Sequence, residues 1–72
     1  MPIDRLLKRR GIGPENSERL RLAFNLALRG LQLVDRNDPI CEIVARKVIE
    51  IDKYGTHDAR QIAAEAIKQL GP

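Results

Sequence analysis

The stretch DPICEIVARKVIEIDKYG, residues 38–55, decides the fold. Its apolar residues recur at helical spacing and cover an arc of about 240° on a helical wheel. The narrow remaining strip is polar and consists of Glu42, Arg46, Glu50 and Lys53. A helix with so wide an apolar surface must pack against other elements on two sides. The pattern predicts a central helix with Asp38 as N-cap, Pro39 as first residue and Gly55 as C-terminal stop.

Two further segments with helical periodicity flank this central helix. The first begins at Pro14, or at Asn16 and Ser17, and runs to about residue 30 or 33. The second begins after Thr56 or Asp58 as its N-cap and runs to residue 70. Because no segment alternates with the period of two that is typical of strands, we expect no sheet.

The sequence therefore predicts one all-α domain, a small three-helix bundle formed by residues 14–72. Residues 1–13 are expected to form a short basic N-terminal arm, either extended or folded into a short helix. A domain of only 72 residues usually needs a disulfide, a metal or a partner chain for stability. The lone Cys41 and lone His57 leave the partner chain as the expected solution.

The helix that begins near residue 14 has a second apolar face. Leu22 and Leu26, extended by Leu33, lie about 180° from the stripe that faces the bundle. We expect a second chain to cover them in a homodimer. The alternative cover is the arm, folded back through its own apolar residues, which are Ile3, Leu6, Leu7 and Ile12.

No constellation in the sequence predicts catalysis, a metal site or a cofactor site. His57 lies in the turn between Asp52 and Asp58, where it is interpreted as turn and cap material. Cys41 is interpreted as a small apolar core residue, since no second thiol exists to resolve it. No apolar run is long enough for a membrane span, and cysteine usage fits a reducing cytoplasm.

The net charge of +3 is concentrated at one end of the chain. Arg5, Lys8, Arg9 and Arg10 outnumber the single acid Asp4 there, and the rest of the chain is electrically balanced. A basic segment of this kind can dock on nucleic acid or an acidic partner. Residues able to contact nucleic acid also occur on the last predicted helix, and they are Arg60, Gln61 and Lys68.

The stretches ALRGL, residues 27–31, LVDRNDP, residues 33–39, and IVARKVIEI, residues 43–51, resemble small uncharacterised helical proteins of alphaproteobacteria. The resemblance implies a bacterial cytoplasmic setting and brings no activity, ligand or binding residue with it.

From these patterns we expect a non-enzymatic protein-interaction or regulatory module that self-associates and binds an unidentified protein partner. The alternative is a nucleic-acid-binding protein that uses the basic arm and the last helix. The two hypotheses differ in salt dependence, because only nucleic-acid binding weakens steeply as salt rises.

Overall fold

The computed structural model describes residues 2–33 and 39–71, and it is all-helical. The helices in the described residues are α1 (Pro2–Arg9), α2 (Pro14–Gly30), α3 (Pro39–Lys53) and α4 (Ala59–Leu70). The all-α prediction is confirmed, and the three predicted helices correspond to α2, α3 and α4. The fourth helix is α1, which lies in the segment expected as a basic arm, either extended or folded into a short helix. Pro39 opens α3 as predicted, whereas the expected N-cap Asp38 lies outside the described residues.

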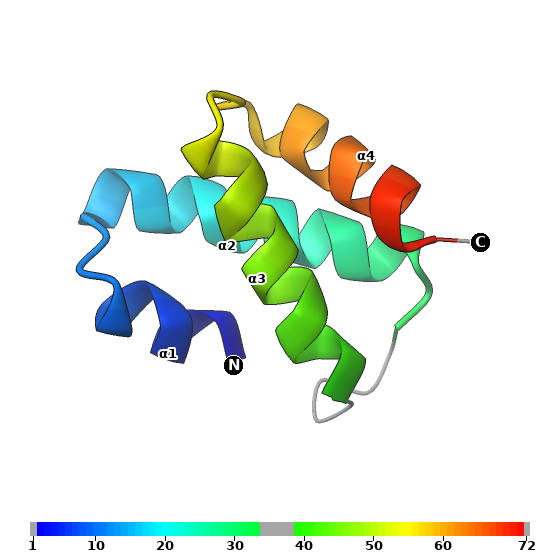
Figure 1. Cartoon of the computed structure of the whole chain (residues 1–72), viewed down its shortest axis with the longest axis horizontal. Helices are drawn as coiled ribbons and strands as arrows, with labels where there is room; N and C mark the ends of the chain where they lie inside the picture. Colours follow the sequence, from blue (N-terminus) through cyan, green and yellow to red (C-terminus); the bar gives the residue numbers. More distant parts are fainter. Residues whose placement is uncertain (1, 34–38, 72) are drawn as a thin grey trace.

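The helix α3 lies at the centre of the arrangement, crossing α2 and running between α1 and α4 (Figure 1). It contacts all three of the other helices, as the wide apolar arc of its sequence predicted. The longest shared interface joins α2 to α4, while α1 packs against α3 and α2 and has no contact with α4. The two outer helices α1 and α4 therefore lie on different sides of the molecule.

The core draws side chains from all four helices. The largest fully buried side chains are Phe24, Ile3, Leu20, Ile62, Val44, Val48 and Cys41. On α1, Leu6 and Leu7 join Ile3 in this core. Burying three large aliphatic side chains contributes about 1.5–3 kcal/mol each. Because its apolar residues complete the core, α1 is an integral part of the fold and not an appendage.

The end of α1 is set by Gly11. Its φ of 65° lies in the left-handed region that glycine adopts without steric cost. The Gly11 amide donates to the Lys8 carbonyl at 3.2 Å, and the Ile12 amide donates to the Leu7 carbonyl at 3.1 Å. These two bonds form a Schellman motif, which satisfies carbonyls at a helix C-terminus. Gly11 therefore stops the helix and turns the chain toward α2.

The end of α2 uses the same motif without glycine. Gln32 adopts a φ of 59°, its amide donates to the Arg29 carbonyl at 3.1 Å, and the Leu33 amide donates to the Leu28 carbonyl at 2.9 Å. The motif places Leu33 half-buried against the core. A left-handed conformation costs a non-glycine residue about 1–2 kcal/mol. The turn at Gln32 is therefore a strained point of the backbone.

The remaining boundaries follow the sequence closely. Pro14 is the first residue of α2, which decides between the two predicted starts. Gly55, with a φ of 107°, ends α3, and its amide donates to the Asp52 carbonyl. The Asp58 side chain accepts hydrogen bonds from two amides in the first turn of α4, which makes Asp58 the N-cap in preference to Thr56.

Replacement of Leu7 tests whether α1 belongs to the core. Leu7 is 2% exposed and Leu22 is 53% exposed, so the same Leu→Ala change removes a buried side chain at one position only. We expect Leu7→Ala to lower the free energy of unfolding by about 2–5 kcal/mol. Leu22→Ala should change it by less than about 0.5 kcal/mol. Urea denaturation followed by circular dichroism measures both, and equal small effects would show that α1 is not packed.

A glycine at position 32 should relieve the strain at the end of α2. We expect Gln32→Gly to raise the free energy of unfolding by about 1 kcal/mol, because glycine removes the steric cost of the left-handed conformation. The converse change, Gly11→Ala, should lower it by a similar amount. Thermal melts compare the two variants with the unmodified chain, and a Gln32→Gly variant less stable than the parent would contradict this geometry.

Candidate functional site

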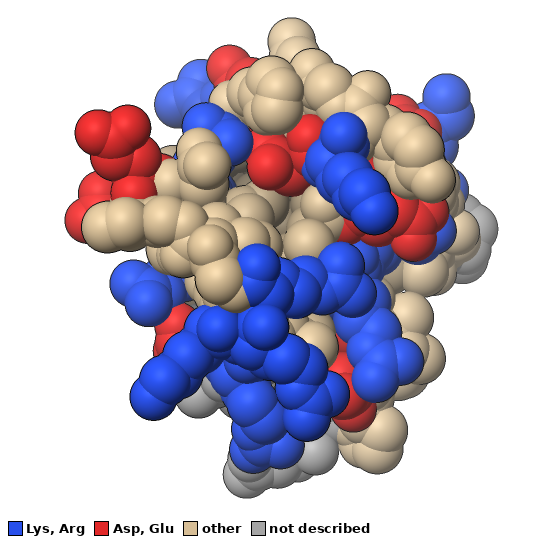
Figure 2. Space-filling model, turned by 60° about the vertical axis from the view of Figure 1, so that its left-hand side comes forward, with Lys and Arg blue, Asp and Glu red and all other residues tan. Residues whose placement is uncertain are grey.

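The outer side of α1 carries three basic side chains, and the turn that follows this helix carries a fourth. Helical periodicity turns Ile3, Leu6 and Leu7 toward the core and leaves the remaining positions facing solvent. We call the exposed residues of this surface the α1 basic face, and they are Arg5, Lys8, Arg9 and Arg10. Figure 2 turns the left-hand side of Figure 1 toward the viewer. In this view, basic side chains gather over the lower half of the molecule.

The charges of the α1 basic face are not neutralised by the rest of the described chain. None of its four side chains forms an ion pair or hydrogen bond with a residue in the described ranges. The single acid of α1, Asp4, accepts a bond of 2.6 Å from Nε of Arg21 on α2. Asp4 therefore contributes an ion pair that joins α1 to α2.

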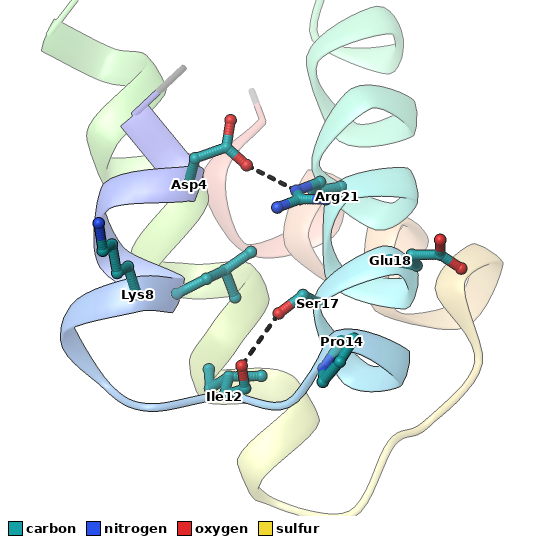
Figure 3. Close-up of a pocket in the computed structure, with 8 residues that line it drawn as sticks. Asp4, Lys8, Ile12, Pro14, Ser17, Glu18 and Arg21 are labelled. Carbon is teal, nitrogen blue, oxygen red and sulfur yellow. Dashed lines mark hydrogen bonds and ion pairs between the residues drawn. The ribbon is translucent and has the colours of Figure 1, made fainter.

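A cleft of about 460 Å³ lies beside this face, between α1 and the first half of α2 (Figure 3). Its lining residues are Asp4, Leu7, Lys8, Ile12, Pro14, Ser17, Glu18 and Arg21. Two bonds cross it: the Asp4–Arg21 ion pair, and a hydrogen bond of 3.2 Å that the Ser17 hydroxyl donates to the Ile12 carbonyl. Two acids balance the two cations of the lining, so this cleft has no net attraction for an anion. The Asp4–Arg21 ion pair in its lining joins α1 to α2.

The candidate contact residues on α4 do not join the α1 basic face. Arg60, Gln61 and Lys68 are all exposed, and Gln61 and Lys68 share one side of α4 because they lie two turns apart. Since α1 and α4 have no contact with each other, the two sets of residues belong to separate surfaces. Among these candidate contact residues, α1 carries three cations, Arg5, Lys8 and Arg9, and α4 carries two, Arg60 and Lys68.

The three leucines expected at a dimer interface have different surroundings. Leu22 is 53% exposed, on the side of α2 that faces away from the buried stripe. Leu26 and Leu33 are half-buried against the core of the same chain. The segment before α2 packs against α2 and α3, and Leu22 is left in solvent. Self-association through Leu22, Leu26 and Leu33 stays a prediction.

Two apolar residues of α3 are more exposed than the sequence analysis expected. Ile40 and Ile43 were counted within the buried arc of the central helix, but they are 47% and 52% exposed. The wide apolar arc predicted more burial for Ile40 and Ile43 than the structure shows, because α1, α2 and α4 cover the other sides of α3. Ile40 and Ile43 lie on α3, whereas the exposed Leu22 lies on α2.

Side-chain contacts connect the turn that holds His57 to α2 and α3. Asp52 Oδ1 accepts bonds of 3.2 Å and 2.9 Å from Nε and Nη2 of Arg19, and it lies 3.1 Å from Nδ1 of His57. The cluster joins α2, the end of α3 and the turn before α4. The sequence analysis did not identify Arg19 because its partner is 33 residues away along the chain. This network gives Asp52 and His57 a structural role.

Other reactive groups have structural surroundings as well. Cys41 is fully buried among apolar side chains, so its thiol is inaccessible to solvent. In the part of the chain that the structure describes, no group of three or more histidine, cysteine or acidic side chains is arranged to hold a metal ion. Among the helices of residues 2–33 and 39–71, none has the length and apolarity needed to cross a membrane.

Comparison with known proteins gives no significant match to a protein-family model, a curated protein or a solved structure. The resemblance to small alphaproteobacterial proteins and the cytoplasmic setting that it implies stay predictions. The functional argument consequently rests on the α1 basic face.

Proposed function

We propose that the protein is a small non-enzymatic binding module that attaches to nucleic acid through the α1 basic face. The observation that carries the proposal is the display of four exposed cations, none paired with an acid in the described residues: Arg5, Lys8 and Arg9 on a helix anchored in the core, and Arg10 in the turn that follows it. Lysine and arginine that neutralise phosphates release condensed counterions, which supplies most of the affinity in sequence-independent nucleic-acid binding.

Anchoring of α1 strengthens this proposal relative to a flexible arm. The burial of Ile3, Leu6 and Leu7 fixes the backbone from which the cations project. Binding then has to order only side chains, at about 0.5–1.5 kcal/mol each, and not the backbone of the segment as well. A preformed cluster of charges also attracts a polyanion over a distance of about 10 Å at moderate salt.

Helix stability alone does not explain the whole basic face. Cations in the last turn of a helix interact favourably with its dipole, which accounts for Lys8 and Arg9. That effect falls off within one turn, and Arg5 lies earlier in the helix. The position of Arg5 on the same exposed side is better explained by a partner with several negative charges.

The sequence analysis favoured a protein-interaction module, and the nucleic-acid proposal takes precedence here for a structural reason. The apolar surface expected for a protein partner is reduced because Leu26 and Leu33 are half-buried, and the exposed Leu22 lies on a different helix from Ile40 and Ile43. The basic residues, in contrast, are all exposed on one short helix and the turn that follows it.

Neutralisation of the outer face of α1 tests the proposal. We expect the chain to bind duplex DNA with a log–log salt slope of about −3.6, which corresponds to four phosphate contacts. The triple variant Arg5→Gln, Lys8→Gln, Arg9→Gln should lower the affinity at least about tenfold and reduce the slope to about −1. Fluorescence anisotropy of a labelled duplex, repeated at several salt concentrations, measures both quantities.

The matched control removes three positive charges from other surfaces. Arg29→Gln, Arg60→Gln and Lys68→Gln change exposed residues on α2 and α4, and should leave the salt slope within about one unit of the parent. Circular dichroism verifies that both triple variants are folded. Equal loss of binding in the two variants, or binding that survives in the α1 variant, would contradict the proposal and assign the contact to another surface.

A further inference from the structure

The composition of the α1 basic face also bears on which form of nucleic acid it would bind. We infer that the face contacts the sugar–phosphate backbone of a duplex, without selection for sequence, and does not bind single strands by their bases. This inference rests on the proposed function and specifies its substrate class.

Single-strand binding usually needs aromatic side chains on which bases stack, at about 1–3 kcal/mol per base. The chain has only two aromatic residues. Phe24 is fully buried in the core, and Tyr54 is 81% exposed but follows α3, outside the α1 basic face. The face therefore has no stacking platform, and electrostatic attraction to phosphates is the interaction that remains.

Base contacts that select a sequence also use neutral polar side chains. Asparagine, glutamine, serine and threonine are the neutral side chains that read base edges, and α1 contains none of them. Arginine can read guanine, but α1 is backed by α2 and α3 and presents only its outer side. The charges on that side match a repeated anionic backbone in preference to a defined base sequence.

Counterion release favours the duplex over the single strand for the same four contacts. Each neutralised phosphate contributes about 0.9 to the salt slope on B-form DNA and about 0.7 on a single strand. An eight-residue helix is about 12 Å long, and a duplex presents one charge per roughly 1.7 Å of its axis. The duplex consequently offers the α1 basic face more phosphates within reach than an unstacked strand does.

The experiment compares three labelled probes at low salt with the full chain. The probes are an A·T-rich duplex and a G·C-rich duplex, each of roughly 20 base pairs, and an oligo-thymidine strand of equal length. We expect the two duplexes to bind within about threefold of each other and the single strand to bind at least about threefold more weakly. The variant Tyr54→Ala should leave all three affinities unchanged.

The possible outcomes separate this inference from the proposed function. If the single strand binds as tightly as the duplexes, or one duplex binds tenfold tighter than the other, the inference is overturned. Weaker single-strand binding in Tyr54→Ala would also overturn it, by showing that stacking contributes. If one of these outcomes is observed and binding still depends on Arg5, Lys8 and Arg9, the inference is overturned but the proposed function stands. Absence of binding to every probe contradicts both.

Discussion

The packing of Ile3, Leu6 and Leu7 against α3 and α2 is the interaction on which the rest of this structure depends. A chain of 72 residues buries little surface, so each large apolar side chain is a substantial part of its stability. Without α1, one side of α3 would lose its cover. The N-terminal helix thus completes the core of a domain whose other three helices pack on one another.

The same packing determines where the positive charge is displayed. In a helix of eight residues, fixing the apolar side inward fixes the basic side outward, because both follow from one periodicity. The Asp4–Arg21 ion pair and the turn at Gly11 then hold the helix in a defined orientation beside α2. Stability and the proposed binding surface therefore arise from opposite sides of one element.

Much of this fold could be predicted from the sequence. The starts at Pro14 and Pro39, the stop at Gly55 and the cap at Asp58 depend on local chemistry that a sequence displays. The first helix was underestimated although Ile3, Leu6 and Leu7 have helical spacing and Gly11 is a typical stop, because an eight-residue helix is not stable alone. Its stability comes from tertiary contacts, which the local pattern does not contain. The basic residues were named as a group from the sequence, whereas their display on one face and the Arg19–Asp52 contact depend on the three-dimensional packing.

The most direct test of this account is hydrogen exchange of the α1 amides, measured residue by residue by NMR. The Arg10 amide donates to the Leu6 carbonyl at 3.0 Å, within a helix whose inner side is buried. We expect the amides of Leu7, Arg9 and Arg10 to exchange at least about 100-fold more slowly than in an unstructured peptide. Exchange at the unstructured rate in α1, with α2 and α3 protected, would contradict the account and return these residues to a flexible arm.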